Sequence, residues 1–137
     1  MAGSLRSKET ALRYEAYQKA GGLLGSCVLC AKEPRHEFTY WKIIENAFPY
    51  DAVASRHDMI IPKRHAIEVE LTNEEKEEFE RIKHESPIQD YQFIMEANHW
   101  AKSIPPHFHL HLVIIKDELE DEGPPASPPI LPELGLA

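Results

Sequence analysis

The sequence has little positive charge and no long apolar run. Its 137 residues include 15 lysines and arginines against 23 aspartates and glutamates, a formal net charge of -8. Neutralising nucleic-acid phosphates or a charged membrane surface requires clustered basic side chains. We therefore expect neither an extended nucleic-acid surface nor a membrane partner. No apolar stretch approaches the roughly 20 residues of a spanning helix. A small local site for an anion is still compatible with this composition.

Cysteine is also scarce. The two cysteines, Cys27 and Cys30, are too few for a fold held together by disulfides. The first 18 residues contain no apolar stretch like that of a secretory signal. These two features lead us to expect a reducing, cytoplasmic setting.

The chain has enough apolar residues to form one globular core. Hydrophobic residues make up 42% of the chain. Residue patterns predict a helix over 8–20, a second helix opening at Thr72 with Glu75 three residues later, and strands over 37–48, 57–65, 91–97 and 107–115. These elements predict an α+β fold with an antiparallel sheet packed against helices. A mixed sheet is an alternative, because a helix separates two of the strands.

The chain divides into three parts by composition. We expect an N-terminal helix and loop over 1–26, the main domain over 27–116 and a tail over 117–137. The tail is acidic and then rich in proline, which removes backbone donors and leaves little to build a core. We therefore expect it to be disordered, and residues from about Glu122 onward to be dispensable for folding.

The stretch "HFHLHLV" carries the main chemical signal. His107, His109 and His111 alternate with apolar residues, so a strand would place all three imidazoles on one face. Phe108, Leu110 and Leu112 would then face the core. A single histidine is usually a satisfied polar residue, but three at this spacing indicate a cleft or a metal site. A nucleophile with orienting neighbours and a metal site are both open at this point.

The same residues resemble the histidine triad family. "HFHLHLV" fits its pattern of three histidines separated by apolar residues. "FPYDAVASRHDMIIPKRH" is similar to the family's earlier strand, and "CVLC" lies where many members carry Cys-x-x-Cys. The resemblance covers about residues 27–115. It implies a histidine triad fold and, in many members, two sheets joined across a homodimer.

The resemblance also implies chemistry at a nucleotide phosphate. Members hydrolyse or transfer nucleoside monophosphates from phosphoramidates, dinucleoside polyphosphates or related compounds. His109 would attack the α-phosphorus and form a covalent nucleotidyl-histidine, and His111 would bond phosphate oxygens or orient His109. His107 would either assist or hold a metal. A neutral imidazole is nucleophilic near pH 7, and a covalent intermediate divides one difficult displacement into two.

Three further residues are candidates for substrate binding. Asn46 matches a position where members bond the ribose, although an asparagine before Pro49 is equally typical of a turn. Asn98 and Ser103 would replace the family's asparagine and polar residue before the triad. The chain departs from the family here, because no glycine lies between Asn98 and His107.

The two cysteines predict a zinc site. Cys27 and Cys30 have the Cys-x-x-Cys spacing that chelates zinc. The resemblance implies that His57 and His107 complete a structural Zn²⁺ site. The simpler alternative is a pair of reduced thiols in a turn. A redox motif would be expected at a helix start beside a βαβ unit, and the pattern does not indicate one.

Three other functions compete with the triad enzyme. The first is a nucleotide-binding or interaction module with the same fold and little turnover. The second is a metal-dependent enzyme that uses the three histidines as a facial site, although no acidic ligand lies within the motif. The third is a DNA-end or RNA-cap processor, which the negative charge disfavours.

Overall fold

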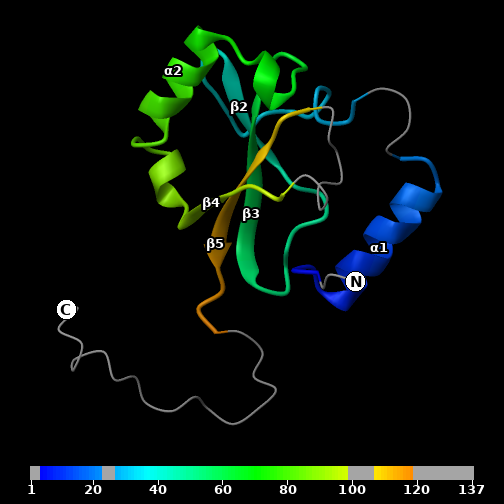
Figure 1. Ribbon diagram of the computed structural model, residues 1–137. Helices are drawn as coiled ribbons and strands as arrows, with labels where there is room; N and C mark the ends of the chain where they lie inside the picture. The colour runs from blue at the N-terminus through cyan, green and yellow to red at the C-terminus, as the bar shows by residue number, and fades with distance from the viewer. Residues whose placement is uncertain (1–3, 23–26, 99–106, 119–137) are drawn as a thin grey trace, which may run out of the picture.

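The computed structural model describes residues 4–22, 27–98 and 107–118. Ser103 and residues 119–137 of the predicted tail lie outside these ranges. The elements are α1 (Lys8–Lys19), β1 (His36–Glu37), β2 (Trp41–Glu45), β3 (Ala54–Pro62), α2 (Asn73–Ile82), β4 (Phe93–Met95) and β5 (Leu110–Ile115), with 3-10 turns at Glu68–Glu70 and Ile88–Asp90 (Figure 1). None of the helices in these ranges is long and apolar enough to cross a membrane.

The five strands form one sheet in the order β1-β2-β3-β5-β4. Every neighbouring pair is antiparallel, so the predicted antiparallel α+β architecture is confirmed and the mixed sheet is excluded. The strand expected over 37–48 is instead a hairpin of β1 and β2. Its turn donates the backbone N–H groups of Thr39 and Tyr40 to the Glu78 carboxylate at 3.1 and 2.7 Å.

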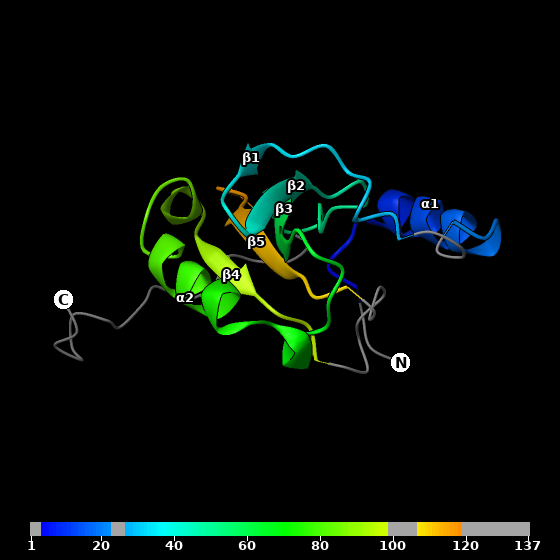
Figure 2. The same ribbon diagram turned by 90° about the horizontal axis from the view of Figure 1, so that it is seen from above.

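Helix α2 covers one face of the sheet, and α1 lies on the other side (Figure 2). Helix α2 begins as predicted, because the Thr72 hydroxyl accepts the Glu75 N–H and the Glu75 carboxylate accepts the Thr72 N–H. Its Ile82 is fully buried. The core under α2 also contains Phe108, Leu110 and Leu112, as expected from the alternation, together with Trp41, Ile43, Ile60 and Ile88.

The acidic run of α2 is only partly exposed to solvent. Glu75 and Glu78 are buried. Their carboxylates accept backbone N–H groups at the start of α2 and in the β1–β2 turn. A buried carboxylate is tolerated when such donors satisfy it, so these two glutamates stabilise loop connections.

The opposite face carries a smaller core and the histidines. Leu29, Ile44, Met59 and Ile61 pack together there, with Cys27 and Val28 against them. Met59 pairs directly with His111 across β3 and β5, which puts the histidine on this face. The N-terminal segment is fixed nearby, because the Ser7 N–H donates to Asp51 at 2.7 Å and the Tyr14 ring lies 5.0 Å from Phe48.

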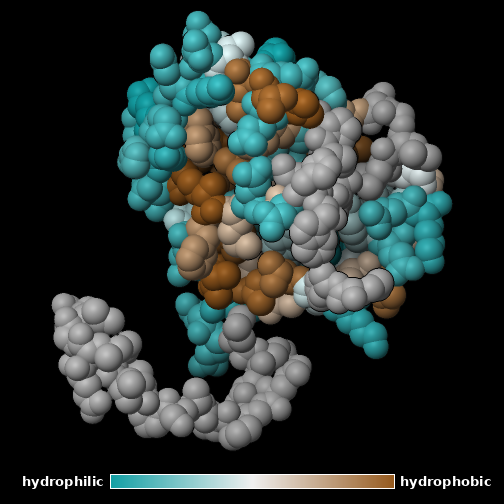
Figure 3. Space-filling model, in the orientation of Figure 1, coloured by the Kyte–Doolittle hydropathy of each residue, from teal (hydrophilic) through white to brown (hydrophobic). Residues whose placement is uncertain are grey.

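Strand β4 forms an open edge of the sheet. Phe93 and Ile94 are 51% and 40% exposed, although both are large and apolar. Figure 3 shows apolar surface over the middle of the face that carries β4 in Figure 1, with more polar surface toward the two helices. An edge of this kind is available for strand pairing.

Candidate functional site

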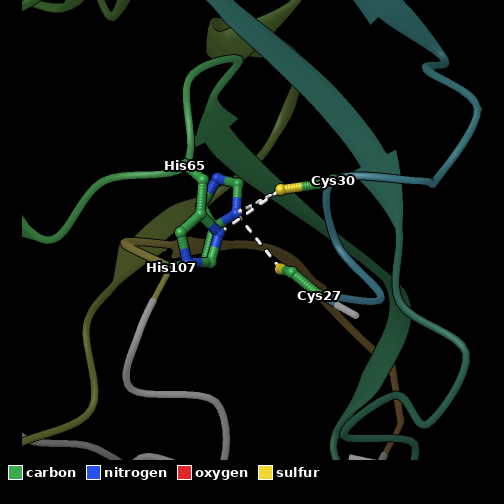
Figure 4. Close-up of side chains that lie close together, drawn as sticks. All are labelled: Cys27, Cys30, His65 and His107. Carbon is green, nitrogen blue, oxygen red and sulfur yellow. Dashed lines mark hydrogen bonds between the residues drawn. The ribbon is translucent and has the colours of Figure 1, made fainter. Parts of the chain in front are cut away.

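The side chains of two cysteines and two histidines meet where β3 ends (Figure 4). Sγ of Cys27 and Sγ of Cys30 each lie 3.4 Å from Nδ1 of His107, and Sγ of Cys30 lies 3.3 Å from Nδ1 of His65. All four ligand atoms lie within 4.8 Å of one another. A Cys₂His₂ cluster of possible metal ligands is therefore present in the fold.

The chemistry and spacing of this cluster fit tetrahedral zinc. Bonds of roughly 2.0 to 2.3 Å place neighbouring ligand atoms roughly 3.3 to 3.8 Å apart. The three sulfur–nitrogen separations fall in that range. Nε2 of His107 lies 2.9 Å from the Pro62 carbonyl, which can only accept a hydrogen bond. This fixes the proton on Nε2 and leaves Nδ1 as the ligating nitrogen, the usual support for a metal-bound histidine.

Burial affects the protonation of two members of the cluster. It raises the pKa of the Cys30 thiol, and nearby Cys27 adds to the rise, while Lys42 opposes it. Burial also lowers the pKa of His107, although the bond to the Pro62 carbonyl works against this. The imidazole is therefore in the neutral form that binds metal, whereas the Cys30 thiol stays protonated near pH 7 unless a cation binds.

His65, and not the predicted His57, completes the cluster. The reason is the antiparallel register of β3 and β5. Ile60 pairs with Leu110, and the Phe108 N–H donates to the Ala66 carbonyl at 2.8 Å, so His107 lies beside the end of β3. His57 pairs with Val113 of β5, six residues further along the chain than His107. Successive strand residues advance about 3.3 Å, so His57 cannot reach the cysteines.

His57 belongs to a second cluster, with Tyr50 and His111. The Tyr50 backbone N–H donates to Nδ1 of His57 at 2.9 Å, so neutral His57 carries its proton on Nε2. That Nε2 lies 2.7 Å from Nδ1 of His111. The proton of neutral His111 is then on Nε2, which lies 3.3 Å from the Tyr50 hydroxyl. One backbone donor thus sets the tautomers of both rings.

His57 is held in its neutral form. Burial first, and the positive charge of Arg6 second, lower its pKa to about 4, while Asp58 opposes the shift. Its side chain is 4% exposed. Near pH 7 the ring is therefore an uncharged hydrogen-bond donor to His111.

His109 stands between the two clusters. Its Nδ1 lies 2.9 Å from the His107 carbonyl, so Nδ1 donates and the lone pair of the neutral ring lies on Nε2. Its ring centroid is 5.3 Å from that of His111, with the planes at 88°. The backbone carbonyl thus fixes which ring nitrogen of neutral His109 carries the proton.

The three triad histidines do not share a metal. Across residues 4–22, 27–98 and 107–118, the Cys27 cluster is the one group of three or more histidine, cysteine or acidic side chains placed to hold an ion. His107 belongs to it, while His109 and His111 direct Nδ1 to a carbonyl and to His57. This geometry does not support the facial metal site.

The predicted substrate residues have different surroundings. The Asn46 side-chain oxygen accepts the Phe48 N–H at 2.8 Å, which is the turn role, and its nitrogen lies 3.4 Å from Nε2 of His57. Asn98 is exposed beyond the end of β4. Ser103 lies outside the described residues. The ribose and phosphate roles of these residues stay predictions.

Sequence reasoning missed three residues near the site. His65 could have been predicted from the sequence. It is the last residue of "IPKRH", and an antiparallel register of the two strands places the end of that stretch beside His107. Tyr50 follows the "FP" of a turn, which gives no indication that its backbone orients His57. Arg6 precedes the domain by more than twenty residues in sequence, so only the fold brings it beside Tyr50.

No family model matches the chain, and no curated protein matches it. Among solved structures, a hypothetical protein from Leishmania major is 19% identical, with a TM-score of 0.49 over 80% of this chain and 89% of that chain. A histidine triad nucleotide-binding protein from Candida albicans is 18% identical, with a TM-score of 0.48 over 80% and 90%. Likenesses at this level do not establish a family or an activity for the chain.

Proposed function

We propose that the chain is a nucleotide hydrolase or transferase of the histidine triad type. Its substrate class is a nucleoside phosphoramidate or a dinucleoside polyphosphate, attacked at the α-phosphate. The observation that carries the proposal is the orientation of His109, whose Nδ1 is bonded to the His107 carbonyl beside the His57–His111 pair. The motif "HFHLHLV" supports the same reading.

The proposed reaction has two displacements at phosphorus. In the first, Nε2 of His109 forms a bond to the α-phosphorus while the bond to the leaving group breaks, and the leaving group departs with its electron pair and takes up a proton. In the second, water or another acceptor attacks the phosphorus, gives up a proton and releases the histidine. Each step is easier than a direct displacement by water.

His111 and His57 would support the phosphate in both steps. The Nε2 proton of His111 is available to a phosphate oxygen in exchange for its contact with Tyr50. His57 keeps that tautomer in place by donating to Nδ1 of His111. A pre-oriented donor of this kind stabilises charge that develops on phosphate oxygens. His107 contributes through its carbonyl, which orients His109.

We propose a structural Zn²⁺ at Cys27, Cys30, His65 and His107. The ion would tie the cysteine turn to the end of β3, and the phosphate chemistry would not pass through it. A reducing, cytoplasmic setting suits this role, because both cysteines are free thiols in the fold.

We also propose that the open β4 edge pairs with a second copy. Phe93 is 51% exposed there, and pairing would cover it. Analytical ultracentrifugation should find a dimer that Phe93→Lys dissociates. A parent protein that sediments as a monomer at high concentration would contradict this proposal.

The decisive experiment is to trap the intermediate. The protein is incubated briefly with an adenosine phosphoramidate or a dinucleoside polyphosphate, quenched and examined by intact-mass and peptide mass spectrometry. We expect a mononucleotide adduct on His109, absent in His109→Ala. An adduct on another residue, or turnover with no adduct under rapid quenching, would contradict the mechanism.

The second candidate is a binding module of the same fold with little turnover. The absence of glycine between Asn98 and His107 favours it, because the resemblance implies a glycine-rich turn there. It predicts tight nucleotide binding by calorimetry, with no product and no adduct after prolonged incubation.

A further inference from the structure

A pocket of about 240 Å³ opens beside His111 on the histidine face of the sheet. Besides His111 of β5, its walls include Arg6 in the N-terminal segment, Tyr50 in the loop before β3, and Glu96 after β4. The N-terminal segment therefore reaches the site although it lies outside the part of the chain that resembles a triad domain.

Arg6 is held in this position by two kinds of contact. Its Nε donates to the Phe48 carbonyl at 2.8 Å. Its guanidinium carbon lies 4.3 Å from the centre of the Tyr14 ring and 5.2 Å from that of Tyr50. The same Tyr50 places its hydroxyl 3.3 Å from Nε2 of His111. Arg6 and His111 thus border one pocket with Tyr50 between them.

The guanidinium of Arg6 is suited to binding phosphate oxygens. A guanidinium has five N–H donors in a planar fork that matches phosphate oxygens, and the Phe48 carbonyl engages the Nε donor. Its positive charge also reaches the histidine cluster, since it contributes to the lowered pKa of His57. In a chain with a formal net charge of -8, an arginine that lines the same pocket as His111 gives an anion a local attraction.

We propose that Arg6 binds the phosphate groups of the leaving group and so sets substrate preference. This inference rests on the proposed function and deepens it. It assigns the pocket to an anionic leaving group, as in dinucleoside polyphosphates, over the neutral amine of a phosphoramidate. Glu96 is exposed at the same pocket, where solvent screens its charge, so the anion lies on the Arg6 side.

The first test is binding of inorganic pyrophosphate, measured by calorimetry on the full chain. The variants are Arg6→Gln, Arg6→Lys and Arg13→Gln. Arg13 is the matched control, because it is an exposed arginine on α1 whose guanidinium lies 5.6 Å from the Phe48 ring and which does not line the pocket. We expect Arg6→Gln to weaken binding about ten-fold or more, from the loss of charge-assisted bonds. The pyrophosphate affinity of Arg6→Lys should lie between those of the parent and Arg6→Gln, and that of Arg13→Gln should stay within about two-fold of the parent.

The second test compares turnover of two substrates. Arg6→Gln should lower kcat/KM for a dinucleoside polyphosphate about ten times more than for an adenosine phosphoramidate, because only the former places anionic oxygens beside Arg6. The ratio of the two values cancels any general loss of folded protein. The ratio in Arg6→Lys should recover part of the parent value.

The outcomes separate this inference from the proposed function. Pyrophosphate binding that Arg6→Gln leaves unchanged, or that Arg13→Gln weakens equally, overturns the role of Arg6, as does a parent that binds no pyrophosphate. A parent with Arg6-dependent pyrophosphate binding but no His109 adduct overturns the proposed catalysis and keeps the anion pocket. An unchanged substrate ratio in an active Arg6→Gln enzyme overturns the assignment to the leaving group.

Discussion

His107 and His111 lie four residues apart in one segment, both buried, yet they stand in different chemical surroundings. His107 directs Nδ1 to two thiols and gives its Nε2 proton to the Pro62 carbonyl. His111 directs Nδ1 to His57 and lies beside a phenol. The first environment suits a metal and the second suits a phosphate. The neighbours of each histidine, which come from β3 and from the loops that hold the cysteines and Tyr50, decide what each position can do.

His109, between them, offers the strongest test of this division. We expect His109→Ala to lower turnover by about a thousand-fold or more, because no neighbour replaces a covalent nucleophile. Metal content and melting temperature should stay near the parent values, since His109 is not one of the four clustered ligands. Steady-state kinetics with metal analysis of the same samples is the measurement. A variant that loses its metal would show that the two clusters are not separate.

The metal cluster should matter for stability more than for catalysis. We expect purified protein to carry one zinc per chain. His65→Asn or Cys27→Ser should remove it and lower the free energy of unfolding by on the order of several kcal/mol. His57→Asn is the matched control and should retain the metal. Elemental analysis and urea unfolding measure both effects. Metal-free parent protein of full stability would contradict the site.

The fourth member of the cysteine cluster, His65 in place of the predicted His57, shows which parts of the site can be predicted from sequence. The alternation in "HFHLHLV" was enough to predict which residues enter the core, because period-two packing is local. The capping box at Thr72 was likewise local. The fourth ligand depended on the register between β3 and β5, a contact between distant segments that spacing alone does not specify. The position of Arg6 beside Tyr50 could not be predicted from sequence either, because it depends on how α1 packs against the rest of the fold.

Acid should act on the two clusters differently. Burial first, and Arg6 second, hold the pKa of His57 at about 4, below its ordinary value of 6.5. The unfolded chain therefore binds more protons between these values. Stability from neutral His57 is complete above pH 6.5 and is lost as pH falls toward 4, in total on the order of 3 kcal/mol.

Urea unfolding at pH 7 and pH 4.5 measures this loss in the parent and in His57→Asn. The variant should show the smaller loss. Both proteins should be compared with chelator present, because acid also releases a metal held by thiolates. Equal losses in the two proteins would mean that His57 titrates normally in the folded state.

The smallest expected effect concerns the hydroxyl of Tyr50. The residue contributes in two ways: its backbone N–H orients His57, and its hydroxyl lies 3.3 Å from Nε2 of His111. Burial raises the pKa of this phenol, so it stays protonated near pH 7. Tyr50→Phe keeps the backbone donor and the ring under Arg6, and removes only the hydroxyl.

A neutral hydrogen bond contributes about 0.5 to 1.5 kcal/mol, so turnover of Tyr50→Phe should change by less than about ten-fold. Kinetics on Tyr50→Phe beside His57→Asn separates the two contributions, because the latter variant loses the imidazole that fixes the His111 tautomer. If Tyr50→Phe is as damaging as His57→Asn, the phenol takes part in the chemistry, and the orientation of His111 is not set by the backbone alone.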